Sequence, residues 1–113
     1  MNQGAHAEQW AMRYLQQQGL QPLAQNYRCR FGEIDLIMQD SATLVFVEVR
    51  LRRHATFGGA AASIDGRKQQ RIIRTAQHYL AGLTRTPPCR FDAVLMDDVQ
   101  GRNVQWLKNA FDA

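Results

Sequence analysis

The sequence predicts a single α/β domain, in which a mixed central sheet is flanked by helices in the order αβββαβ, with one further short strand at the end. Apolar residues recur at helical spacing over about residues 4–18 and again between Asp65 and Leu83. Short apolar or alternating runs lie between and after these stretches and predict strands. With 113 residues, 45% of them hydrophobic, the chain can bury one core, so residues 1–113 are expected to form one domain.

The first expected element is a helix over about residues 4–18. Gly19 and then Pro22 supply its stop. Glu8 lies at the border of the apolar stripe and not opposite it, so its carboxylate can reach the rim of a sheet. The apolar stripe consists of Ala7, Trp10, Ala11, Tyr14 and Leu15.

Three strands are expected next, as an antiparallel meander. Tyr27, Cys29 and Phe31 alternate with arginines and predict a half-buried strand, which Gly32 breaks. Residues 33–39 and 43–52 predict two more strands, joined around a short polar turn. The second of these runs is apolar on both faces, which predicts a strand buried on both sides.

The second half of the chain predicts a crossover helix and two strands. Ser63 or Asp65 can cap the helix. Residues 90–96 are typical of a strand, and Val104–Leu107 predicts a last short strand after a turn. The apolar face of the helix consists of Ile72, Ile73, Ala76, Tyr79, Leu80 and Leu83.

Acidic residues interrupt two of the expected strands. Glu48 and Arg50 stand at i and i+2, so their side chains leave the same face of one strand. If Asp35 of the neighbouring strand faces the same space, two carboxylates converge beside a cation, which suits Mg²⁺ and a phosphate. A carboxylate inside a buried strand needs a cation, a metal or a proton. The alternative is an ordinary ion pair between Glu48 and Arg50.

The net charge of +4 is unevenly distributed. Seven of the fourteen basic residues lie between positions 50 and 74, against one acid, Asp65, whereas the rest of the chain has seven basic and nine acidic residues. Brought to one surface, the cluster would attract a polyanion such as nucleic acid, and the alternative is a solvated helix face. The cluster consists of Arg50, Arg52, Arg53, Arg67, Lys68, Arg71 and Arg74.

No signal-peptide core and no long apolar segment is present in the sequence, so we expect a cytoplasmic protein without a membrane partner. The two cysteines stand apart, without the spacing of a zinc site.

The expected order of elements is that of the restriction-endonuclease-like fold, and the sequence also resembles the YraN family of bacterial proteins over nearly its whole length. The similarity implies kinship with Holliday-junction resolvases and other PD-(D/E)xK nucleases. The motifs that carry it are Glu8-x-x-Ala11-x-x-Tyr14-Leu15, Gly32-Glu33-Ile34-Asp35-Leu36-Ile37, Phe46-Val47-Glu48-Val49-Arg50, Lys68-Gln69 with Ile72, Arg90-Phe91-Asp92 and Asn109-Ala110-Phe111.

By this resemblance, Asp35 and Glu48 are the metal ligands, holding Mg²⁺ or Mn²⁺ together with the backbone carbonyl of Val49. Arg50 stands in the place of the motif lysine, and Glu8 matches the helix glutamate of resolvase-like members. Arg50 departs from the pattern, because arginine does not give up its proton and its fork is broader than an ammonium.

The resulting expectation is a nucleic-acid-binding protein with a nuclease fold, whose activity is a Mg²⁺-dependent cleavage of branched or structured DNA. The alternative is a catalytically silent nucleic-acid-binding or protein-interaction module with the same fold. A choice between DNA and RNA and pairing as a homodimer stay open. The expected nucleic-acid contacts are Arg52, Arg53, Arg67, Lys68, Gln69 and Arg71.

Overall fold

The computed structural model describes residues 3–51 and 64–113 and confirms the predicted fold class. Five strands form one sheet in the order β1-β2-β3-β4-β5. The elements are α1 (Gln3–Gln17), β1 (Gln21–Cys29), β2 (Gly32–Asp40), β3 (Thr43–Leu51), α2 (Gly66–Ala81), β4 (Cys89–Met96) and β5 (Gln105–Phe111).

The sheet is mixed, as predicted. β1, β2 and β3 form the antiparallel meander, and β4 pairs in parallel with β3 because α2 crosses over between them. β5 then returns antiparallel to β4.

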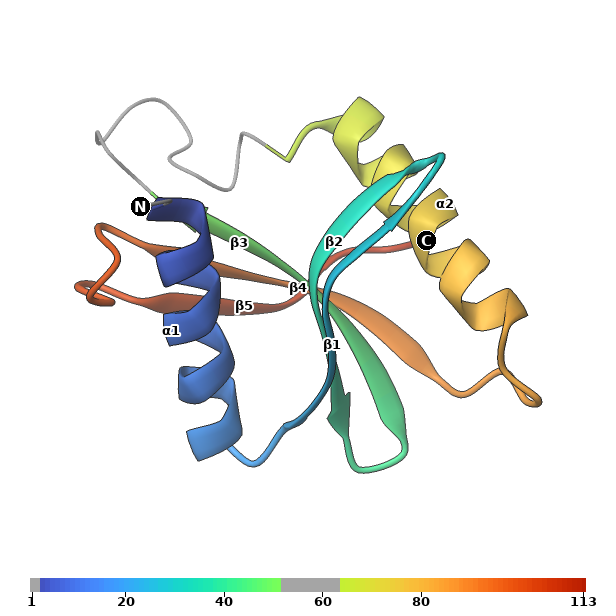
Figure 1. Ribbon diagram of the computed structural model, residues 1–113, viewed down its shortest axis with the longest axis horizontal. Coiled ribbons are helices and arrows are strands. Elements are labelled where there is room, and N and C mark those ends of the chain that lie inside the picture. Colours follow the sequence, from blue (N-terminus) through green and yellow to red (C-terminus); the bar gives the residue numbers. More distant parts are fainter. Residues whose placement is uncertain (1–2, 52–63) are drawn as a thin grey trace.

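The two helices cover opposite faces of the sheet (Figure 1). On β3, Val45 and Val47 pack in the cluster that includes α1, while Phe46 between them packs in the cluster that includes α2. All three side chains are buried, so the prediction of a strand covered on both sides is confirmed.

Some predicted boundaries need correction. Phe31, expected in the first strand, lies in the turn before β2, and the last strand extends to Phe111. Asp65 caps α2, since its side chain accepts a hydrogen bond from the Lys68 backbone N–H at 2.9 Å. The other suggested cap, Ser63, lies outside the described residues.

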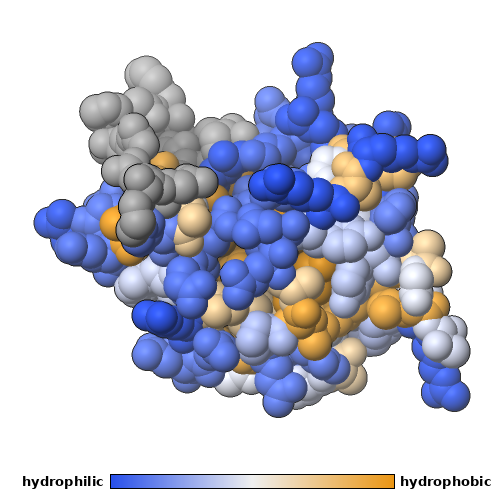
Figure 2. Space-filling view, viewed as in Figure 1, coloured by the Kyte–Doolittle hydropathy of each residue, from blue (hydrophilic) through white to orange (hydrophobic). Residues whose placement is uncertain are grey.

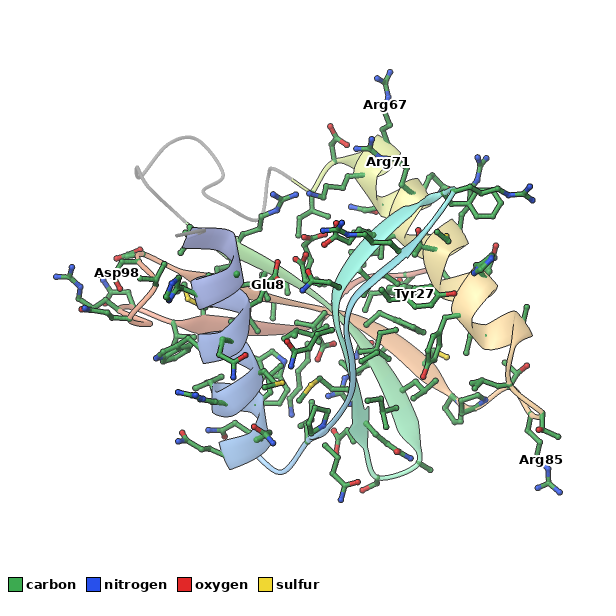
Figure 3. The ribbon with its side chains drawn as sticks, in the orientation of Figure 1. Glu8, Tyr27, Arg67, Arg71, Arg85 and Asp98 are labelled. Carbon is green, nitrogen blue, oxygen red and sulfur yellow. The ribbon has the colours of Figure 1, made fainter. Side chains whose placement is uncertain are left out.

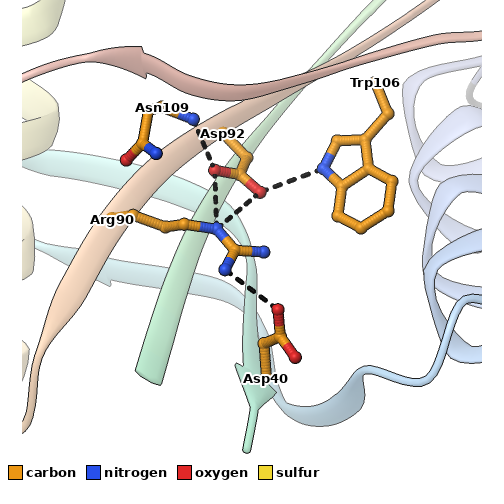
Figure 4. Close-up of polar contacts among 5 residues, drawn as sticks. All are labelled: Asp40, Arg90, Asp92, Trp106 and Asn109. Atoms are coloured by element: carbon orange, nitrogen blue, oxygen red, sulfur yellow. Dashed lines mark hydrogen bonds and ion pairs between the residues drawn. The ribbon is translucent and has the colours of Figure 1, made fainter. Parts of the chain in front are cut away.

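A buried acid on β4 fastens β5 to the sheet (Figure 4). The Asp92 side chain is fully buried and accepts hydrogen bonds from Trp106 Nε1 at 2.9 Å and from the Asn109 backbone N–H at 3.0 Å. Arg90 Nε donates to Asp92 at 3.2 Å, and its Nη1 donates to Asp40 of β2 at 2.9 Å. These contacts tie three strands together.

β2 and β3 separate at one end of their pairing. Leu36 and Val47 form the pair nearest that end, and beyond it Asp35 Oδ2 accepts a hydrogen bond from the Val49 backbone N–H at 2.8 Å. A side chain thus replaces the backbone partner that the ladder would supply. The strands part where two of the acids singled out in the sequence stand, Asp35 on β2 and Glu48 on β3.

Candidate functional site

A pocket of about 400 Å³ occupies the place where β2 and β3 part. We call it the acid pocket. Glu8, Asp35, Glu48 and Arg50, which the sequence singled out from three separate elements, all line it. Its lining consists of Gly4, Glu8, Gly32, Glu33, Asp35, Glu48, Val49, Arg50, Lys68, Arg71 and Ile72.

Carboxylates converge in this pocket. One oxygen from each of Glu8, Glu33 and Asp35 can be chosen so that all three lie within 4.8 Å of one another. Asp35 is fixed by its bond from the Val49 N–H, so the other acids gather around a held carboxylate. Oxygen ligands at this spacing are those that Mg²⁺ and Mn²⁺ take in proteins.

Glu48 is the most buried of the acids that line the pocket, with 8% of its surface exposed. Burial raises the pKa of Glu48 from 4.5 to about 9, and a hydrogen bond to Asp35 and the negative charge of Asp35 act in the same direction. The positive charge of Arg50 opposes this rise in the pKa. The protonated form of Glu48 is therefore favoured unless a cation offsets the charges of Glu48 and Asp35.

Glu8 reaches the same cluster from α1. Burial raises the pKa of Glu8 from 4.5 to about 7, helped by the charge of Asp35 and a hydrogen bond to it, while a hydrogen bond with Asn26 lowers it. Asp35 thus stands between two glutamates whose protonated forms are favoured. The sequence pattern placed Glu8 at the border of the apolar stripe, and the side chain is partly exposed there.

Two cations face Glu48 from different elements. Arg50 Nε lies 3.9 Å from Glu48 Oε1, and Lys68 Nζ from the first turn of α2 lies 3.8 Å from Glu48 Oε2. The Lys68 side chain is 25% exposed, so it borders both the pocket and solvent. The sequence placed Lys68 only among the nucleic-acid contacts, because nothing in the spacing shows that its side chain reaches from the start of the crossover helix to Glu48 on β3.

Glu33 is the second residue whose place the sequence missed. It precedes Asp35 by two positions on β2, and this spacing puts both side chains on one face of a strand. This spacing, visible in the sequence, could have placed Glu33 beside Asp35. Glu33 is exposed and also pairs with Arg28 of β1, with its Oε2 3.1 Å from Arg28 Nε.

Besides Lys68, the expected nucleic-acid contacts divide into three groups. Arg67 and Arg71 are exposed near the N-terminal end of α2, at the same end of the molecule as the acid pocket (Figure 3). Gln69 Nε2 donates to the Ile64 carbonyl at 3.0 Å, so its amide helps to hold the start of the helix. Arg52 and Arg53 lie outside the described residues.

The surface around the pocket is polar. Figure 2 shows strongly hydrophilic side chains projecting at the upper right, where α2 begins, further hydrophilic side chains along the left and lower edges, and a hydrophobic patch near the centre and right of the same face. Among the described residues, no helix has the length and apolar character that a membrane crossing requires.

Comparison with known proteins gives the relationships of the chain. The model of uncharacterised protein family UPF0102 matches residues 7–96. A UPF0102 protein of Nitrosomonas europaea is 60% identical over 111 residues, covering 98% of this chain and 94% of the relative. A UPF0102 protein of Methylobacillus flagellatus is 56% identical over 110 residues, covering 97% of this chain and 96% of the relative. The chain belongs to the UPF0102 family, which is the YraN family that its motifs resemble.

Proposed function

We propose that this protein binds nucleic acid and cleaves phosphodiester bonds in branched or structured DNA, using Mg²⁺ or Mn²⁺. The observation that carries the proposal is the acid pocket, where Glu8, Asp35 and Glu48 converge from three elements beside Arg50 and Lys68. Like charges gathered in this way destabilise a fold, so their assembly favours a functional role over a structural one.

The residues present fit a divalent cation. Asp35 and Glu48 would hold it, as the sequence predicts. The carboxylate oxygens that lie within 4.8 Å of one another are those of Asp35, Glu8 and Glu33, so the last two would add ligands beside Asp35. A bound cation would also offset the burial and the negative charge of Asp35 that together favour protonated Glu48. When bound, such a cation lowers the pKa of a water molecule and polarises a phosphate oxygen.

Lys68 supplies the compact ammonium that the strand lacks at Arg50. Its Nζ stands 3.8 Å from Glu48 Oε2, where it can orient an attacking water and stabilise charge on the phosphate as the bond breaks. Arg50 contributes positive charge from the strand but no proton, because a guanidinium stays protonated in proteins. The two cations divide between them what the motif lysine does alone.

A catalytically silent module is the second candidate, and a specific observation favours it. Glu48 stands between Arg50 and Lys68, so its charge can be satisfied inside the fold without a metal. In such a module the acids would serve as internal ion-pair partners, and the basic surface alone would bind nucleic acid.

A single-turnover cleavage assay separates the two candidates. Junction, flap and linear duplex substrates are incubated with Mg²⁺ or Mn²⁺ and with identically purified wild type, Glu48→Ala, Lys68→Ala and Arg50→Lys. We expect Glu48→Ala to abolish cleavage and Lys68→Ala to slow it about 100-fold, the effect of losing one charge-stabilising group. Arg50→Lys should raise the rate, because it restores a compact ammonium on the strand.

Arg67→Ala is the matched control for Lys68→Ala, because Arg67 is the neighbouring basic residue of α2 and is not part of the pocket lining. The cleavage rate of Arg67→Ala should fall only by the factor expected from its weaker binding to the substrate. Cleavage that persists in Glu48→Ala marks a contaminating nuclease. No cleavage by any of these proteins with either metal would establish the silent module.

A further inference from the structure

A second depression, of about 690 Å³, adjoins the acid pocket on the side of the β1–β2 turn. Gly32, Glu33 and Arg71 line both, so the two form one continuous surface. We call the second depression the turn groove. It is lined by Arg28, Cys29, Arg30, Phe31, Gly32, Glu33 and Arg71.

The turn groove is positively charged. Arg28, Arg30 and Arg71 are exposed around it, and Glu33 is the one acid in its described lining. Glu33 is paired with Arg28, which leaves Arg30 and Arg71 as the cations that no acid of this lining pairs. Guanidinium groups that line one depression suit the phosphates of a polymer that continues out of the acid pocket.

An aromatic ring stands among these cations. Phe31 is partly exposed in the turn, and the Arg30 guanidinium carbon lies over its ring, 4.8 Å from the centroid. The His78 ring of α2 meets Phe31 edge-on at 6.4 Å between centroids. An aromatic ring beside arginines is the arrangement on which unpaired nucleic-acid bases stack.

The turn is fixed against α2. Gly32 has a φ of +150°, and a Cβ at this position would come within 3.2 Å of Thr75 Oγ1. The positive φ and this tight contact with α2 both favour glycine, so the turn that carries Phe31 is packed closely on the helix. The Arg28–Glu33 ion pair also joins residues that face each other across the β1–β2 ladder. A base that stacks in the groove therefore meets a preformed surface.

We propose that the turn groove binds an unpaired nucleotide of the strand whose neighbouring phosphate lies in the acid pocket; this rests on the proposed nucleic-acid function. The substrate class that follows is nucleic acid with a single-stranded segment beside the cleaved bond, such as a flap or the open centre of a junction. Arg30 and Arg71 contact the phosphates, and Phe31 stacks on the base.

The test is equilibrium binding without divalent cations, so that no cleavage occurs. Fluorescence anisotropy compares a flap substrate with a blunt duplex of the same length, and a 2-aminopurine base in the flap reports stacking. Wild type should prefer the flap and quench the 2-aminopurine. Phe31→Leu should weaken flap binding about tenfold, leave duplex binding nearly unchanged and remove the quenching, since one stacked base is lost.

Arg30→Gln should weaken flap binding with less effect on the blunt duplex. Arg85→Gln is the matched control, because Arg85 is an exposed arginine beyond the opposite end of α2 (Figure 3), and it should reduce binding to both substrates equally or not at all. Melting temperatures within a few degrees of wild type confirm that each variant folds.

The outcomes separate this inference from the proposed function. If Phe31→Leu lowers the affinity for flap and duplex equally, or lowers neither, the proposed role of the turn groove is wrong, while the proposal of nucleic-acid binding stands. Loss of flap preference in Phe31→Leu supports the groove even if the cleavage assay shows a silent module. Wild type that binds neither substrate overturns both.

Discussion

The carboxyl group of Glu48 gives the protein a pH-dependent stability. Because its pKa is about 9 in the folded chain and 4.5 when unfolded, the folded state binds this proton more tightly. The resulting stabilisation is fully present below about pH 4.5 and is lost as the pH rises through about 9. Glu8 acts in the same direction, with a pKa raised to about 7.

We therefore expect the metal-free protein to become less stable as the pH rises from about 5 to about 9. Glu48→Gln should flatten the upper part of this dependence, because the amide keeps the shape of the side chain and does not ionise. Its melting temperature near pH 8 should equal or exceed that of wild type. Thermal unfolding in buffers of matched ionic strength, with a chelator present, measures both effects.

Asp112→Asn serves as the control, because it removes an exposed carboxylate that does not line the acid pocket. Its pH dependence should follow that of wild type. A large fall in melting temperature for Glu48→Gln, of the size that follows removal of a buried ion-pair partner, would instead show that Arg50 and Lys68 depend on the Glu48 charge.

At the scale of elements, β5 depends on Asp92. The buried carboxylate accepts hydrogen bonds from Trp106 Nε1 and the Asn109 backbone N–H, both on β5. It also accepts one from Arg90 Nε on its own strand. In Asp92→Asn, an amide N–H₂ group replaces one of the oxygens that accept these hydrogen bonds, so donor faces donor. The substitution also removes the negative charge beside Arg90. We expect the free energy of unfolding to fall by about 3–5 kcal/mol, measured by urea denaturation.

Trp106→Phe provides the graded comparison. It keeps most of the ring and removes one donor to Asp92, so it should cost about 1–3 kcal/mol, less than Asp92→Asn. If Asp92→Asn cost no more than Trp106→Phe, the Arg90 contacts would contribute little to holding β4 and β5 together.

The same network explains why the end of the chain was predicted too short. Periodicity alone supports a strand only to Leu107, since Lys108, Asn109 and Ala110 offer no apolar alternation. The structure continues the strand to Phe111 because Asp92 accepts the Asn109 N–H and Phe111 stacks on Phe91, at 4.9 Å between centroids. These are contacts between distant positions, which a local pattern does not contain.

At the scale of the whole molecule, the exposed Arg67 and Arg71 lie near the start of α2, at the end of the molecule that holds the acid pocket. Arg67→Ala combined with Arg71→Ala should flatten the dependence of log affinity for duplex DNA on log salt by about two units, because each phosphate contact contributes about 0.9. Anisotropy titrations at several salt concentrations measure the slope. The double variant Arg13→Ala with Arg85→Ala removes the same charge from two other exposed positions. Slopes that fall equally in the two variants would mean that binding is spread over the whole surface.

Sequence patterns predicted most of the architecture, because helical and strand periodicity with glycine and proline breaks is strong in this chain. They also singled out Glu8, Asp35, Glu48 and Arg50, which line one pocket. They missed the place of Lys68 beside Glu48, since it depends on where the crossover helix begins over the sheet. Phe31 was misplaced because the alternating pattern continues two residues past Cys29, where β1 ends.

Glu8 reaches the acid pocket from α1, whereas Glu33, Asp35 and Glu48 stand on the sheet. Any cation that binds all of them must therefore hold α1 against β2 and β3. By reciprocity, whatever loosens α1 weakens the hold on the cation by the same factor. Ala11 is buried on the face of α1 that packs on the sheet and carries no ligand. Ala11→Gly would then lower the affinity for the metal without changing any of the carboxylates.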